Sequence, residues 1–230
     1  MFKPEDILYE DNHLIAVNKH TGDLVQSDPD GTTSLEDEVK AYIKRRDNKP
    51  GAVFLGVIHR IDRPVSGVVL FAKTSKALTR MNEAVRLRKI DKRYWAITEE
   101  RPEDESGELR HWIARDGKTN KSHVYQKPKG DAQEALLNYA LIGASTNYTL
   151  LEIHLITGRH HQIRAQLARI GCPIKGDLKY GAARSNKGGG ISLHSRSVRF
   201  EHPTLKEEIF IEAPVPREDN LWQFFEESQA

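Results

Sequence analysis

The sequence has 230 residues, of which 38% are hydrophobic, and this is enough for one substantial domain with a buried core. Its net charge of +2 is too small to make the whole surface a polyanion binder, so any nucleic-acid contact must come from local groups of cations. The single cysteine, Cys172, excludes a disulfide framework and a thiolate metal cage, and it favours a reducing compartment. Because no signal segment or membrane-spanning apolar run is evident, we expect a cytoplasmic protein without a membrane partner.

The N-terminal region predicts two short strands within residues 7–19, which turn at Glu10-Asp11-Asn12. Ser34 can cap a helix that runs to about Arg46 and carries apolar side chains at helical spacing. We assign this helix a packing role.

The stretch from Gly56 to Lys73 reads GVIHRIDRPVSGVVLFAK and organises the rest of the chain. It predicts a strand over residues 56–61 and a second over 67–72, separated by a break that contains Pro64 and Gly67. If the alternation of the first strand continues, Arg60 lies beside Asp62 and favours an ionised carboxylate, as a nucleophile or a general base requires. A surface ion-pair loop would show the same spacing.

A second helix, beginning at Thr74 or Ser75, is expected to direct its arginines outward. Two groups of cations follow, and either is a solvated face or an RNA contact. The first contains Arg80, Arg86, Arg88, Lys89, Lys92 and Arg93, and the second contains Lys118, Lys121, Lys127 and Lys129.

The remaining pattern is dominated by strands. Residues 92–98 alternate as a strand that contains Tyr94, and residues 107–126 and 134–156 each predict a hairpin. Two further strands are expected within 193–214, and a terminal helix over 217–227 that docks through Leu221, Trp222, Phe224 and Phe225. The predicted class is α+β, with a mixed, largely antiparallel central sheet flanked by helices and loops, in a single domain over 1–230 with a catalytic cleft.

The segment Thr157 to Gly171 reads TGRHHQIRAQLARIG and predicts a helix after Gly158. Arg164 lies at the edge of its apolar stripe, next to Ile163, and an arginine aimed toward a core needs an acid. Asp62 is the partner that we expect.

A metal site is not expected, because His59, His154, His160 and His161 do not combine helical i, i+4 spacing with a third ligand. The loop over residues 182–190 lacks the glycine and lysine order that cradles a phosphate, so no nucleotide cofactor is expected either.

Four motifs resemble those of the RluA family of RNA pseudouridine synthases. HRIDRPVSG is similar to the family's HRLDRxTSG, TGRHHQIRAQL to TGRxHQIRxHL, GDLKYG to GDxxYG, and Tyr94 matches the tyrosine of a K-x-Y context. Ile61, Val65 and Gln166 depart from the family pattern. The resemblance covers about Ile7 to Pro214 and implies the catalytic domain alone, without the S4-type RNA-binding domain that many relatives carry.

The resemblance implies that Asp62 is catalytic, that Arg164 pairs with it, and that Tyr94 packs on the uracil and could serve in proton transfer. Ile163 would line the uracil pocket. Arg60 would fill the space left by the flipped base or hold a phosphate nearby, and the same motif places His59 and Arg63 among the residues expected to bind RNA.

The implied function is the isomerisation of specific uridines in structured RNA, either rRNA or tRNA, after base flipping. Since nothing is added or lost, no cofactor is expected, and we expect a monomer. The residues do not decide whether Asp62 attacks C1′ of the ribose or takes a proton from C2′.

Two other classes of function were weighed against this one. A glycosidase-like hydrolase would need a second carboxylate across the scissile bond, and neither main motif supplies one near Asp62. A catalytically inactive RNA-binding module of the same fold would be expected to lack Asp62, Tyr94 or Arg164, all of which are present.

Overall fold

The structure is a computed structural model and describes residues 2–27 and 31–229. Its contacts divide the chain into two compact units. The first unit contains Met1–Ile90 and Ser195–Pro214, and the second contains Asp91–His194 and Val215–Ala230.

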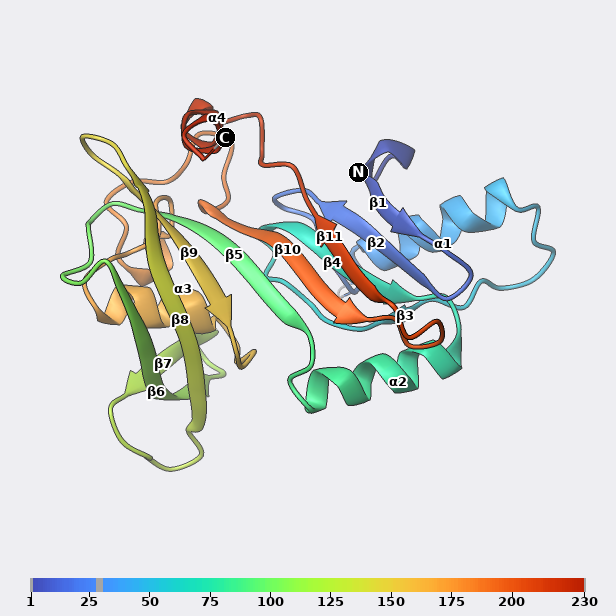
Figure 1. The fold of residues 1–230 in the computed structure, drawn as a ribbon, viewed down its shortest axis with the longest axis horizontal. Coiled ribbons are helices and arrows are strands. Elements are labelled where there is room, and N and C mark those ends of the chain that lie inside the picture. The colour runs from blue at the N-terminus through green and yellow to red at the C-terminus, as the bar shows by residue number, and fades with distance from the viewer. Residues whose placement is uncertain (1, 28–30, 230) are drawn as a thin grey trace. The chain divides into compact units, whose positions relative to one another are not determined.

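The first unit is built on a largely antiparallel sheet with two α-helices and one 3₁₀ turn (Figure 1). Its strands follow the order β1-β2-β4-β10, with β3 paired to β4 and β11 paired to β10. The strands are β1 (Ile7–Glu10), β2 (Leu14–Lys19), β3 (Gly56–Val57), β4 (Ser66–Ala72), β10 (Leu193–Glu201) and β11 (Glu208–Glu212). The helices are η1 (Pro4–Asp6, a 3₁₀ turn), α1 (Leu35–Arg46) and α2 (Ser75–Arg86).

Both predicted helices of this unit form where their caps indicate. The Ser34 hydroxyl accepts the Asp37 N–H, and the Thr74 hydroxyl accepts the Ala77 N–H, so each side chain satisfies a donor of the first turn. Helix α2 packs across β4, and Met81 lies in the same apolar core as Leu70 (Figure 1). This core holds β4, the strand that follows residues 58–65, in place.

The strand predicted over residues 56–61 is wrong in length, because β3 ends at Val57. Beyond Val57 the pairing with β4 is only partly made by the backbone. The Ile58 N–H still donates to the Leu70 carbonyl, but the Leu70 N–H donates to the His59 side chain, at Nε2. The alternation used to place Arg60 beside Asp62 therefore does not reach the motif.

The second unit is an antiparallel sheet in the order β5-β9-β8-β6-β7. Its strands are β5 (Asp91–Thr98), β6 (Ser106–Asp116), β7 (Lys121–Tyr125), β8 (Gln133–Ala144) and β9 (Thr149–Leu155). Its helices are α3 (Gln162–Arg169), η2 (Leu178–Tyr180, a 3₁₀ turn) and α4 (Asn220–Glu227). The two predicted hairpins are confirmed, and with them the mixed, largely antiparallel fold class.

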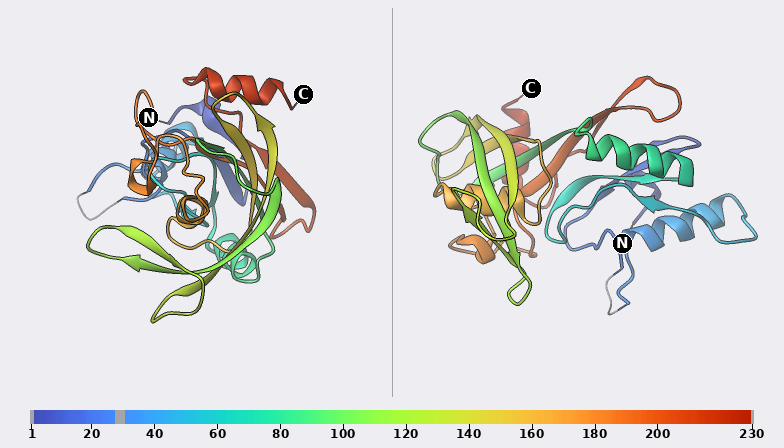
Figure 2. Two further views of the ribbon diagram at one scale, coloured as in Figure 1. Left: turned by 90° about the vertical axis from the view of Figure 1, so that its left-hand side faces the viewer. Right: turned by 90° about the horizontal axis from the view of Figure 1, so that it is seen from below.

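The C-terminal helix docks as expected through part of its predicted face. Trp222 and Phe225 are buried in a core with Trp95 and Leu150, and Figure 2 shows α4 next to the turn between β8 and β9. Phe224 is wrong as a docking residue, since half of its surface is exposed. Phe224 lies two positions after Trp222 and one before Phe225, and helix positions one or two apart do not share a face.

Candidate active site

Asp62 lies in a short irregular loop of the first unit, between β3 and β4. The loop turns at Arg63 and Pro64, and the Val65 N–H donates to the Asp62 carbonyl at 3.0 Å. Val65, which stands where the family pattern has Thr, is buried. The turn is therefore closed by the backbone and by apolar packing.

Lys19, at the end of β2, holds the Asp62 loop in place. Its side chain is fully buried, and its ammonium donates to the carbonyls of His20, Asp23 and Arg63 at 2.8, 2.9 and 3.1 Å. Burial lowers the pKa of Lys19 to about 8, while Asp23 and Asp62 act in the opposite direction. A buried positive charge thus ties the residue after Asp62 to the 20–23 turn and lies near the Asp62 carboxylate.

The buried ammonium predicts a specific dependence of stability on pH. An unfolded lysine titrates near pH 10.4, so between about pH 8 and 10 the unfolded chain holds a proton that folded Lys19 has lost. The contribution of Lys19 to the free energy of unfolding should therefore rise with pH in that window, by roughly 2–3 kcal/mol, and be flat below pH 8.

Urea unfolding between pH 7 and 10 measures this slope. Lys19→Met should remove it, whereas the exposed helix residue Lys44 can be changed to Met without effect on the slope. Equal slopes in wild type and Lys19→Met would contradict the assignment.

Gly67 brings β4 close to β10 just after the Asp62 loop. Its φ is +110°, and a Cβ added here would lie 2.3 Å from the Ser195 carbonyl oxygen. A side chain at this position would therefore both strain and displace the strand.

Gly67→Ala is expected to lower the free energy of unfolding by about 3–5 kcal/mol, the sum of backbone strain and overpacking. Gly51→Ala is the matched control, because its Cβ would meet no atom within 4 Å and its φ is not positive. A denaturation midpoint for Gly67→Ala equal to that of Gly51→Ala would refute the steric argument.

The residues flanking Asp62 have distinct environments. The His59 ring accepts the Leu70 N–H at 3.2 Å and so holds the motif to β4. Arg63 Nε donates to the Gly22 carbonyl at 3.0 Å, and Gly22 N–H donates back to the Arg63 carbonyl at 2.9 Å. Both His59 and Arg63 have an anchoring role that the sequence did not predict. Arg60 is exposed.

Arg164, on α3 of the second unit, has a buried carboxylate partner in the same unit. Its Nε and Nη2 donate to the two carboxylate oxygens of Asp177 at 2.6 and 2.9 Å, and both side chains are almost fully buried. This two-pronged pairing fixes the plane of the guanidinium. The pairing of Arg164 with Asp62 stays a prediction.

Tyr180 covers the same guanidinium, with Arg164 Cζ 5.1 Å from the centre of its ring. The Tyr180 hydroxyl accepts the Ser122 N–H at 2.7 Å and lies 3.0 Å from His161 Nδ1. Burial, with a smaller contribution from Arg164, lowers the pKa of His161 to about 2, so the ring is neutral beside the guanidinium. The GDLKYG segment thus holds Arg164 through both Asp177 and Tyr180.

His161 also explains why α3 begins later than predicted. It adopts a left-handed conformation with φ of 52° immediately before Gln162, so the chain turns at His160 and His161 before the helix starts. The buried Gln162 side chain accepts the Arg159 N–H and the Thr157 hydroxyl and donates to the Leu136 carbonyl. The TGR segment is therefore held to the sheet before the helix starts.

Three further residues of the motifs are buried in the second unit. Tyr94 lies on β5 opposite Ile153, and Ile163 lies on α3 next to Arg164; each is 5% exposed. Gln166, where the family has His, donates to the carbonyls of Leu109 and Ala135, so it joins α3 to β6 and β8. The structure assigns this position a structural role.

Half of the cations in each of the two predicted groups are engaged by neighbouring groups. In the first, Arg80 donates to the Pro203 carbonyl, Arg86 pairs with Glu83, and Arg93 pairs with Asp91. In the second, Lys121 and Lys129 lie over the rings of Tyr180 and Tyr125 at 5.2 and 4.7 Å. Whether either group contacts RNA stays a prediction.

Among the described residues, no group of three or more His, Cys, Asp or Glu side chains is arranged to hold a metal ion. Within the same residues, no helix has the length and apolarity required to cross a bilayer.

Comparison with known proteins places these motifs in a family. The family model described as RNA pseudouridylate synthase matches residues 13–169. The tRNA pseudouridine synthase C of Haemophilus ducreyi is 33% identical over 245 residues, covering 95% of this chain and 93% of its own length. The ribosomal large subunit pseudouridine synthase C of Buchnera aphidicola is 33% identical over 217 residues, covering 91% and 66%.

The fold gives the same result. The structure of human RNA pseudouridylate synthase domain containing 4 matches with a TM-score of 0.77 and 25% identity, over 97% of this chain and 91% of the human chain. The chain therefore belongs to the RNA pseudouridylate synthase family, and it is an isomerase that acts on RNA.

Several residues that shape the two motifs escaped the sequence analysis. Lys19 was assigned no role, because nothing local shows that its amine will be enclosed by three carbonyls. Asp177 and Tyr180 lie in the GDLKYG motif, but no contact with Arg164 was predicted for them. A signal for Arg164 was present, since a buried arginine requires an acid, but it does not say which one.

Proposed function

We propose that the protein converts specific uridines of structured RNA, either rRNA or tRNA, to pseudouridine, with Asp62 as the catalytic carboxylate. The observation that carries this proposal is the presence of Asp62, Tyr94 and Arg164 at the matching motif positions of a chain similar to a tRNA enzyme over 93% of its length. Similarity to a ribosomal large subunit enzyme supports rRNA as the other substrate class.

The proposed reaction breaks the bond between uracil N1 and ribose C1′, turns the uracil while it stays bound, and joins C5 to C1′. Asp62 acts at the ribose, either on C1′ or on the C2′ proton. Its loop is suited to this role because the Lys19 ammonium and backbone hydrogen bonds hold it in place. No atom is gained or lost, so the reaction needs no cofactor.

Arg164 is proposed to pair with Asp62 and orient it. The bidentate contact with Asp177 supports this role, because it holds the guanidinium in a fixed plane. Tyr94 and Ile163 are proposed to contact the uracil, and their burial is consistent with a site that excludes water from a reactive intermediate.

Extruding a uridine from structured RNA costs a few kcal/mol, which contacts to the flanking RNA must supply. We propose that the exposed Arg60 provides such a contact, either in the space left by the base or at a phosphate. His59 and Arg63 are proposed to contribute from the same loop. We further propose a cytoplasmic monomer.

Release of tritium from C5 tests this function. The substrate is total RNA labelled with 5-tritiated uridine, prepared from cells that lack this gene, and the protein should release label in proportion to pseudouridine formed. An inactive RNA-binding module would release none, and a hydrolase would yield free labelled uracil. Sequencing the RNA for pseudouridine then identifies the modified RNA and position.

A further inference from the structure

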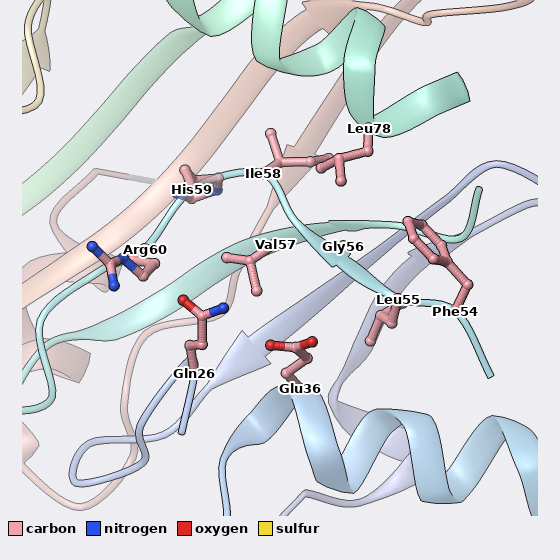
Figure 3. A pocket seen from close by; sticks show the side chains of 10 residues that line it. All are labelled: Gln26, Glu36, Phe54, Leu55, Gly56, Val57, Ile58, His59, Arg60 and Leu78. Atoms are coloured by element: carbon pink, nitrogen blue, oxygen red, sulfur yellow. The ribbon is translucent and has the colours of Figure 1, made fainter. Parts of the chain in front are cut away.

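A pocket of about 420 Å³ lies in the first unit, beside the segment that leads to Asp62 (Figure 3). Its volume is within the range of small-molecule sites, about 300–1,000 Å³. The lining comes from the loop before α1, from α1, from α2 and from the chain around β3.

The polar part of the pocket is a carboxylate with an amide. Figure 3 shows the side chains of Glu36 and Gln26 directed toward the pocket beside Val57. One Glu36 oxygen, Oε1, accepts from the Lys40 ammonium. The carboxylate only accepts hydrogen bonds, whereas the amide both donates and accepts. Together they are suited to a planar group that presents several donors.

The apolar part of the pocket contains an exposed aromatic ring. Phe54 lies at the end of the β3 segment opposite Arg60 and is 47% exposed (Figure 3). Leu78 of α2 closes on Gly56, where an added Cβ would lie 2.6 Å from a Leu78 methyl carbon. The ring and the aliphatic surface together form an apolar wall to which a planar base can bind.

The pocket lies near the proposed catalytic residue along the chain. Arg60 is two residues from Asp62, and two residues of extended backbone span at most about 7 Å. A nucleotide near the target uridine is therefore within reach of this pocket when the uridine is at Asp62.

We propose that this pocket binds one unstacked guanine of the RNA substrate, close to the target uridine. The base lies against Phe54, its Watson–Crick edge contacts Glu36 and Gln26, and a phosphate nearer the target uridine lies at Arg60. The inference rests on the proposed role of Asp62, because that role places the target uridine next to the pocket.

The charge of the pocket favours a base over the RNA backbone. The Glu36 carboxylate repels phosphate, whereas Arg60 at the far end attracts it. Among the four bases, guanine presents adjacent imino and amino donors on its Watson–Crick edge, which a carboxylate accepts. Unstacked bases in loops and bulges are the usual targets of sequence-specific RNA recognition, and they stack on aromatic side chains.

Equilibrium binding of short RNAs tests this inference. The probes are fluorescein-labelled heptauridine and six versions with one guanine at each position on either side of the central uridine. Guanine at one position should lower the Kd at least about fivefold for the wild type, as expected for specific base contacts. Glu36→Gln should abolish this gain, and Phe54→Ala should weaken binding of all probes about tenfold through lost stacking.

Matched controls are available in the same unit. Phe210→Ala removes a phenyl ring that is 52% exposed and lies outside the pocket, and Glu83→Gln neutralises a helix carboxylate that pairs with Arg86. Both variants should bind the probes as the wild type does. Melting temperatures of all four variants show whether any has lost its fold.

Three results would overturn the proposal: no effect of guanine at any position, a guanine effect retained by Glu36→Gln, or equal affinities of Phe54→Ala and Phe210→Ala. Absence of binding to every probe would also overturn the proposal, because guanine would then have no effect at any position. Asp62→Asn should bind the probes like wild type, since binding needs no turnover. Failure of the catalytic proposal would therefore appear in tritium release and not in these affinities.

Discussion

Replacing Asp62 by Asn is expected to lower pseudouridine formation by more than about 10³-fold, because the amide can neither attack C1′ nor take the C2′ proton. The change is nearly isosteric, and the Asp62 backbone contact to Val65 does not involve the side chain. RNA affinity should stay near that of the wild type because the amide keeps the shape of the side chain, and the melting temperature shows how far loss of the negative charge near Lys19 lowers stability. Tritium release under single-turnover conditions measures the loss.

Asp47→Asn is the matched control for this variant. Asp47 is a carboxylate of the same unit that pairs with Arg46 at the end of α1, away from the motif loop in the sequence. It should retain full activity. An Asp62→Asn protein that still isomerises uridine would remove the basis of the proposed mechanism.

Arg164→Met is expected to lower the rate by about 10²–10³-fold with only a modest change in RNA affinity, because Asp62 would lose its proposed orienting partner. The same variant leaves Asp177 buried without its guanidinium, which typically costs about 3–5 kcal/mol of stability. Loss of activity alone would therefore not separate catalysis from folding.

The double variant Arg164→Met with Asp177→Leu makes that separation. Replacing a buried ion pair by apolar side chains of similar volume is often close to neutral for stability. We expect urea unfolding of the double variant near that of the wild type while the rate stays as low as in Arg164→Met. Unchanged turnover in the single variant, or recovery of turnover in the double variant, would show that Arg164 acts only through folding.

The sequence by itself determined most elements of the fold. Ser34 and Thr74 cap their helices because a side-chain oxygen can satisfy a first-turn donor using residues three positions away. The hairpins over β6–β7 and β8–β9 are equally local, since alternating residues and a polar turn are read from neighbouring positions. The motifs around Asp62 and Arg164 also sufficed to indicate the family that the comparisons establish.

Of the two errors, one arose where a distant group replaced a local rule and the other where the faces of a helix were not separated. Alternation predicted six residues of strand from Gly56, but a histidine side chain takes over a ladder position at Leu70 and the strand ends at Val57. The apolar pattern of α4 included Phe224, yet neighbouring positions on a helix face different directions. Periodicity reports only the spacing of residues along the chain and not the groups that folding brings next to them.

Only the tertiary structure decided which charges meet. It pairs Arg164 with Asp177, encloses the Lys19 ammonium in three carbonyls, and gathers Glu36, Gln26 and Phe54 around one pocket. Each arrangement includes residues whose separation along the chain follows neither a helical nor a strand repeat. The physical reason is that helical and strand propensities act over a few residues, whereas ion pairs and pockets form between segments that packing brings together.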